Sequence, residues 1–154
     1  MLLCLQSDQS SDMFEGNKAC SFVCVLPERY ELNTNGRGKW FIGLTEITLP
    51  IVKSSRKWEA IYVCCQQCEY SVVGQIYKPI VASFSVGEIK RNNFTRFSPV
   101  HYVPLKVDNL DQINVEICHS NGEVIEELHN GVKDSVTKCV FDLQWQIGTS
   151  PWRP

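Results

Sequence analysis

The sequence has no excess of charge of either sign, no long apolar run and almost no helical pattern. Its 154 residues include 15 lysines and arginines against 17 aspartates and glutamates, which gives a formal net charge of −2. A general nucleic-acid binder is normally clearly basic, so that class is disfavoured. No window approaches the roughly 18 apolar residues of a transmembrane helix. We therefore expect neither a nucleic-acid partner nor a membrane span.

Motifs of common catalytic and nucleotide sites are also missing. The chain has no G-x-S-x-G, no H-E-x-x-H, no P-loop and no paired-glycine nucleotide fingerprint. The segment 36–39 (Gly-Arg-Gly-Lys) lacks the Walker spacing and is better explained as a hairpin turn. The three histidines, His101, His119 and His129, lack the close H-x-H spacing expected of a metal-binding cupin. We expect no enzyme, no cofactor and no small-molecule substrate.

Cysteine is the residue in unusual supply, with eight in the chain. The apolar run at residues 1–5 ends at once in polar residues, so it is too short for a signal peptide. We therefore expect a protein made in a reducing compartment, where its cysteines are mostly free thiols. Free cysteine behaves as a small hydrophobic residue and is often buried.

One cysteine cluster leaves several interpretations open. Cys65 and Cys68 form a C-x-x-C, a spacing that zinc sites and redox dithiols both use. On a continuous strand, however, these two side chains face opposite sides of the sheet. Further thiols at possible ligand spacing are Cys20 with Cys24, and Cys118 beside His119. Buried thiols are the favoured interpretation, and the sequence leaves open whether Cys64, Cys65 and Cys68 are free, disulfide-bonded or metal-bound.

Strand patterns dominate the middle of the chain. Residues 113–118 and 136–145 alternate between apolar and polar, which is typical of strands with one buried face. Residues 58–65, read as a strand, place Ile61, Val63 and Cys65 on one face and Tyr62 and Cys64 on the other. Asn-Gly pairs mark turns between the runs. The best helical window, 123–129, is short and is expected as the returning arm of a hairpin. The expected strands span residues 21–26 (ended by Pro27), 40–49, 58–65, 75–84 (interrupted by Pro79), 100–107 (interrupted by Pro104), 113–118 and 136–145.

This pattern predicts one all-β domain over residues 17–147, a β-sandwich or jelly roll. Residues 1–16 are expected to be a flexible N-terminal arm, because residues 6–12 are polar and lack any period. Residues 148–154 contain two prolines and are expected to be a C-terminal tail. A tryptophan in such a tail, Trp152, suits a partner's pocket.

Three segments carry a more specific pattern. They are Lys39-Trp-Phe-Ile-Gly-Leu-Thr-Glu-Ile-Thr-Leu-Pro50, then Ile61-Tyr-Val-Cys-Cys-Gln-Gln-Cys-Glu-Tyr-Ser-Val-Val-Gly-Gln-Ile-Tyr-Lys-Pro-Ile80, then Phe97-Ser-Pro-Val-His-Tyr-Val-Pro104 with Ile113-Asn-Val-Glu-Ile117 and Gly122. In this order they resemble blocks of the minor capsid, or penton, proteins of Polinton/Maverick elements and the related adintoviruses. Those blocks are W-x-V-x-L-x-E-I-x-x-P, I-Y-V-Y-x-D followed by V-G-D-x-x-x-P-L, and F-x-P-x-H-Y-V-P followed by I-x-I-x-I and D-x-G.

The resemblance covers about residues 20–146. The chain departs from the family pattern at residues 64–68, where acidic and aromatic residues are usual, and at Gln75, where aspartate is common. It also departs at 120–121, and it is shorter than many relatives between residues 49 and 58.

The resemblance implies a single jelly roll, an eight-stranded sandwich of two packed antiparallel sheets. It further implies homopentamers at the fivefold vertices of an icosahedral virion, assembled inside the host cell beside a double jelly-roll major capsid protein. We expect interface residues in the tail and in the 95–104 loop. They are Trp152, Arg153, Arg96, Phe97, His101 and Tyr102.

Two alternatives stay open. The first is a β-sandwich binding module that recognises a carbohydrate or a peptide at its loops or edges. The second, ranked last, is a metal-dependent enzyme on a cupin-like jelly roll.

Overall fold

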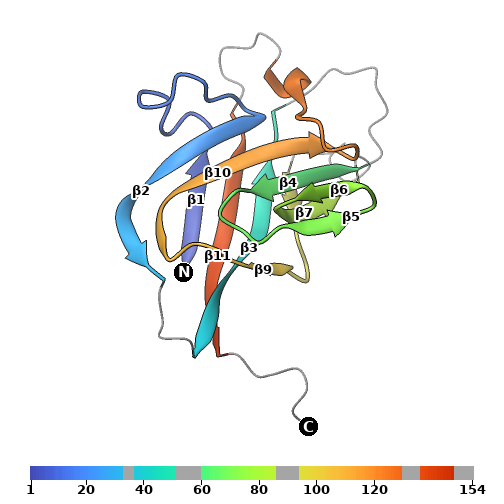
Figure 1. The fold of residues 1–154 in the computed structure, drawn as a ribbon. Coiled ribbons are helices and arrows are strands. Elements are labelled where there is room, and N and C mark those ends of the chain that lie inside the picture. The colour runs from blue at the N-terminus through green and yellow to red at the C-terminus, as the bar shows by residue number, and fades with distance from the viewer. Residues whose placement is uncertain (33–36, 51–59, 86–93, 130–135, 148–154) are drawn as a thin grey trace.

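The computed structural model describes residues 1–32, 37–50, 60–85, 94–129 and 136–147. These residues form β-strands and one short 3-10 helix, η1 (Glu126–His129) (Figure 1). This helix, the only one in the described ranges, falls far short of what crossing a bilayer requires. The strands are β1 (Leu2–Gln6), β2 (Ser21–Glu31), β3 (Gly38–Thr48), β4 (Ile61–Cys65), β5 (Ser71–Val73), β6 (Ile76–Lys78), β7 (Ile80–Phe84), β8 (Phe94–Arg96), β9 (Tyr102–Pro104), β10 (Asn109–His119) and β11 (Lys138–Ile147).

Most strands belong to two antiparallel sheets. The first has the order β1-β11-β3-β8, with β9 also paired to β3, and the second has the order β2-β10-β4-β7. In Figure 1 the strands of the second sheet cross over those of the first. One apolar core draws on both sheets, with Ile42 and Phe141 from the first and Ile113 and Val63 from the second fully buried. The all-β prediction is confirmed, and the arrangement is consistent with a β-sandwich.

The strands predicted from alternation bury the faces that the pattern indicates. Along β4, Ile61, Val63 and Cys65 belong to the main core, while Tyr62 and Cys64 contribute to a separate small cluster on the outer face. On β10 and β11, alternate residues are likewise buried. A one-residue slip would expose a whole apolar face, so this burial fixes the register of each strand.

A β-bulge divides β3 into two halves. Leu44 pairs with Phe141 and Glu46 with Val140, so Thr45 is the extra residue on β3. Its hydroxyl donates to the carbonyl of Val140 at 2.9 Å. The bulge resets the alternation, and Leu44 and Ile47, three residues apart, are both buried.

The predicted flexible arm at residues 1–16 is wrong over its first six residues. Leu2–Gln6 is strand β1, which pairs with β11 at the edge of the first sheet and buries Leu3 and Leu5. Beyond it, the polar residues tie the chain down, because the Ser10 hydroxyl accepts from the backbone N–H of Val25 at 3.0 Å. Side-chain hydrogen bonds to backbone groups thus supply order that no apolar period predicts.

The prediction that Pro27 ends the second strand is also wrong, since β2 continues to Glu31. Between the pairs Val25–Gln112 and Tyr30–Leu110 the ladder with β10 is irregular. Pro27 lies in this irregular stretch of an edge strand, where its missing N–H breaks no ladder hydrogen bond.

Of two further segments, the first differs from expectation and the second is interrupted where it was predicted to be. Residues 123–129 do not form a returning hairpin arm; after one bridge between Cys118 and Val124, the chain turns into η1. The expected strand at 75–84 is divided at Pro79 into β6 and β7, and β6 pairs with β5 in a separate hairpin. The turns expected at 35–36 and 130–131, and the predicted tail, lie outside the described residues.

Candidate functional site

The 95–104 segment lies along one edge of the first sheet. Strand β8 pairs with the second half of β3 and β9 with its first half, on either side of the bulge. The intervening residues leave the sheet and approach β7 of the other sheet. The segment thus closes one side of the sandwich.

Two of the residues expected at an interface are engaged within the chain. The Arg96 guanidinium forms an ion pair with Glu46 at 2.9 Å and stays 70% exposed. Phe97 is half-buried, and its ring meets Phe84 of β7 in an edge-on contact at 5.7 Å. Its N–H donates to the carbonyl of Thr45, the bulge residue, at 2.9 Å. Phe97 therefore joins the two sheets, while Arg96 keeps a surface available to a partner.

Tyr102 is held in a hydrogen-bonded network across β3. Its hydroxyl donates to the Asp142 carboxylate at 2.7 Å and accepts from the Gln144 amide at 3.0 Å. Burial opposes ionisation of Asp142, but the hydrogen bonds from Tyr102, Gln144 and the Met1 ammonium together lower the pKa of this carboxyl. The bond to Asp142 raises the pKa of Tyr102. Tyr102 thus fastens β9 to β11.

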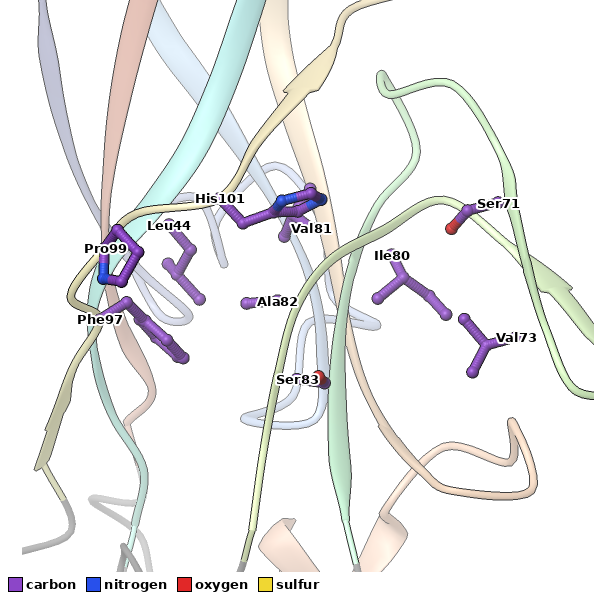
Figure 2. Close-up of a pocket in the computed structure, with 10 residues that line it drawn as sticks. All are labelled: Leu44, Ser71, Val73, Ile80, Val81, Ala82, Ser83, Phe97, Pro99 and His101. Atoms are coloured by element: carbon purple, nitrogen blue, oxygen red, sulfur yellow. The ribbon is translucent and has the colours of Figure 1, made fainter.

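A groove of about 400 Å³ runs between this segment and β7 (Figure 2). Leu44, Phe97, Pro99 and His101 lie toward one side of it, and residues of β5 and β7 toward the other. Its lining is mostly apolar, with the exposed His101 as the titratable group. The groove can receive an extended, largely apolar segment, and the two serines that line it, Ser71 and Ser83, offer hydroxyl groups.

The β5–β6 hairpin exposes apolar and aromatic surface beside the groove. Val72 is 70% exposed and Tyr77 67% exposed. The rings of Tyr70 and Tyr77 lie 4.9 Å apart, and the Lys106 ammonium lies 4.3 Å from the centre of the Tyr70 ring. Clustered exposed apolar side chains of this kind mark interaction surfaces more often than isolated ones do. We call Tyr70, Val72, Val73 and Tyr77 the hairpin surface.

Behind this hairpin, on the outer face of the second sheet, lie two thiols and a lysine. The Lys78 ammonium lies 3.5 Å from the Cys118 sulfur and 3.4 Å from the Glu116 carboxylate. A hydrogen bond from the Cys64 thiol lowers the pKa of Cys118, and Lys78 adds to this, while burial opposes both. The same hydrogen bond, together with burial, raises the pKa of Cys64.

Cys65 and Cys68 do not face opposite sides of the sheet, which corrects the expectation from the sequence. Strand β4 ends at Cys65, and a turn brings Cys68 back into the same core. Cys20 and Cys24 are buried elsewhere, and burial raises the pKa of each to about 11. Within the described ranges, no three cysteine, histidine or acidic side chains are placed to hold a metal ion.

The interface residues predicted from the sequence include the 95–104 segment but not the hairpin surface. A usable signal is present in Ser71-Val-Val-Gly-Gln-Ile-Tyr-Lys78, where a glycine opens a two-residue turn between β-branched and aromatic residues. Gly74 adopts a φ of 61° at that turn. Trp152 and Arg153 lie outside the described residues.

Comparison with known proteins adds no assignment. No protein-family model matches the chain, and no curated protein matches it significantly.

Proposed function

We propose that this chain is a jelly-roll capsid protein that forms the pentameric vertex, or penton, of an icosahedral virion. The strand order of the two sheets is the observation that carries the proposal. Counting β8 and β9 as one interrupted strand and setting the β5–β6 hairpin apart as an insertion leaves eight strands. In that count the first sheet has the order 1-8-3-6 and the second the order 2-7-4-5.

This order pairs strand 1 with 8, 2 with 7, 3 with 6 and 4 with 5. A chain folded back on itself once and then rolled up produces these four pairs, which is how a jelly roll is built. The resemblance of residues 20–146 to penton proteins points to the same architecture. The proposal includes no enzymatic role.

A ring of five subunits requires two different surfaces that meet head to tail. The hairpin surface supplies apolar area for one of them, with Val72 and Tyr77 at its centre. In Figure 1 this hairpin lies on the side of β4 and β7, whereas β1 and β2 form the opposite edges of the two sheets. Leu2 on β1 is 63% exposed there. Two apolar areas on opposite sides suit a closed ring.

The proposed partners are further copies of this chain and a double jelly-roll major capsid protein, assembled inside the host cell into the virion. The test is the oligomeric state of the purified full chain by light scattering, with negative-stain electron microscopy. We expect five-membered rings, and incorporation into shells when the major capsid protein is co-expressed. A strictly monomeric chain at micromolar concentration that does not join such shells would contradict the proposal.

The groove favours one second candidate, a β-sandwich module that binds a peptide or a carbohydrate. Its apolar lining and its position beside an aromatic hairpin fit an extended ligand. This alternative predicts a monomer that is retained on a peptide or glycan array, with retention lost when Ser83→Trp, at an exposed residue of the lining, fills the groove. A pentamer without array binding excludes it.

A further inference from the structure

The C-x-x-C at the end of β4 closes a tight turn. The backbone N–H of Cys68 donates to the carbonyl of Cys65 at 3.0 Å. The ends of such a turn lie within about 7 Å of each other, close to the range of Cα separations that a disulfide spans. Both side chains are fully buried, and they belong to the same core cluster.

Hydrogen bonds from a middle residue of the turn, Gln67, to neighbouring segments hold the turn in place. The Gln67 amide donates to the Asn114 side chain at 3.0 Å, and its oxygen accepts from the Asn114 N–H at 2.9 Å. The Lys106 N–H donates to the Gln67 carbonyl at 2.9 Å, and Cys68 itself bridges Leu105. The surrounding strands therefore fix the backbone of the turn that carries the two cysteines.

The surroundings distinguish the two thiols. The Cys68 thiol donates a hydrogen bond that lowers the pKa of Cys65; the N–H groups of Gln67 and Cys68 and the charge of Lys106 add to this against burial. The pKa of Cys68 is raised by that same hydrogen bond and by burial. Because the thiolate is the nucleophile in disulfide exchange, Cys65 is the attacking group.

We propose that Cys65 and Cys68 form a reversible dithiol–disulfide couple that exchanges with a low-molecular-weight disulfide such as glutathione disulfide. The Cys65 thiolate attacks one sulfur of the small disulfide, whose S–S bond breaks and releases one thiolate. The Cys68 thiol then gives its proton to that leaving thiolate, and its sulfur attacks the mixed disulfide. The Cys65–Cys68 bond forms and a second small thiolate leaves, which takes up from solvent the proton that Cys65 released on ionising. The pair loses two electrons, and the small disulfide gains them.

Exchange proceeds through local opening of the turn, since both sulfurs are buried in the closed form. Gln66 and Gln67, the two residues between the cysteines in the sequence, are half-buried. Closing the bond links the end of β4 to Cys68, which forms a bridge with Leu105 just after β9. The proposal does not depend on the capsid role, because every contact that carries it lies within one subunit.

The neighbouring pair, Cys64 and Cys118, is a control within the same molecule. It is equally buried. However, Cys64 pairs with Glu116 across the strands, so Cys118 is its diagonal neighbour. Diagonal neighbours lie roughly 7–8 Å apart, beyond the reach of a disulfide without backbone movement. Cys118 is also engaged by Lys78. This pair is expected to stay reduced.

The experiment equilibrates the full chain in a series of reduced and oxidised glutathione mixtures, traps free thiols by alkylation in denaturant, and maps them by mass spectrometry. We expect all eight cysteines to be alkylated at the reducing end. At the oxidising end, Cys65 and Cys68 are lost together, and their peptide has the mass of an internal disulfide. Returning the sample to reduced glutathione restores both.

Two alanine variants test which cysteines the disulfide bond requires. Cys64→Ala is expected to form the bridge as the wild type does, while Cys68→Ala leaves Cys65 alkylatable or joined to glutathione. The wild-type map decides the question even if a variant fails to fold. Persistence of all eight thiols at the oxidising end, or a bridge between Cys64 and Cys118 instead, would overturn the proposal.

Discussion

Tyr102 reaches over Gly43 to donate a hydrogen bond to Asp142, 2.7 Å away on the far side of β3. The three residues lie in line across three strands, since Gly43 pairs with both of the others. A Cβ on Gly43 would stand 3.0 Å from the Tyr102 ring, so the missing side chain makes room for this reach. The edge of the first sheet is thereby fastened to its interior.

Tyr102→Phe should lower the free energy of unfolding by about 1 kcal/mol near neutral pH, because it removes a hydrogen bond to a carboxylate. The pKa of Asp142 is lowered in the folded chain. The ionised Asp142 therefore stabilises the fold above the ordinary aspartate pKa. This stabilisation is lost as the pH falls through the lowered pKa of the folded chain. The difference between variant and wild type should therefore shrink in acid. Urea unfolding across pH measures it. The exposed Tyr77→Phe is the control, and an equal loss there would refute the assignment.

Gly43→Ala should cost about 1–3 kcal/mol through overpacking. The new methyl group would stand 2.5 Å from the Cγ1 of Val100 as well as against the Tyr102 ring, and both belong to the segment beside the groove. Gly16→Ala is the matched control, since nothing lies within 4 Å of its Cβ position. Equal unfolding midpoints for the two variants would show that the close approach at Gly43 is unimportant.

Phe97→Ala should destabilise the chain by about 2 kcal/mol, below the 3–5 kcal/mol typical of fully buried phenylalanines. The ring is half-buried and contacts Phe84 of the other sheet. Phe94→Ala, three residues away on the exposed side of β8, should cost less than about 1 kcal/mol. Thermal unfolding of both variants provides the comparison, and the reverse ranking would contradict the role of Phe97 as a link between sheets.

If the hairpin surface is a subunit contact, Val72→Glu and Tyr77→Glu should each weaken self-association by about tenfold or more, because a charge replaces a buried apolar anchor. Monomer stability should change little, since both side chains are largely exposed within one subunit. Sedimentation across a concentration series measures association. Met13→Glu, also exposed and distant in sequence, is the control, and unchanged association in the hairpin variants would remove this surface from the interface.

Closing the Cys65–Cys68 bond should raise the free energy of unfolding by up to ~2 kcal/mol, less than the ~3 kcal/mol of a 15-residue loop, because the closed loop is short. Denaturant titrations of the oxidised and reduced chain measure the difference. A lower stability of the oxidised form would show that the bond strains the turn.

The sequence predicts the strands whose residues alternate between buried and exposed. It does not predict the segments whose conformation is set by polar hydrogen bonds or by turns. The faces of β4, β10 and β11 follow from alternation alone. Strand β1 is too short to show a period, and its pairing partner β11 lies at the other end of the chain. The meeting of Cys65 with Cys68 depends on where β4 ends, which is set by the hydrogen bonds between Gln67 and Asn114. Local pattern carries no information about such distant partners.

For the candidate site, the 97–104 motif identified the segment but not its contacts. That Arg96 meets Glu46 and Phe97 meets Phe84 follows from strand pairing and sheet packing, which no single segment encodes. The hairpin could have been predicted from the sequence, because Gly74 marks its turn.

The bulge at Thr45 lies beside the break between β8 and β9. Between Gly43 and Glu46, β3 has two residues, whereas the neighbouring chain has five, residues 97–101, between Tyr102 and Arg96. These five residues leave the sheet between β8 and β9, and the Phe97 N–H donates to the Thr45 carbonyl. The groove beside β7 exists because of that detour. Shortening this detour by three residues would let β8 and β9 join as one strand and would remove the groove, whereas lengthening the detour would enlarge the groove. The length of this one surface segment, and not a residue of the strand beside it, thus governs the shape offered at the surface.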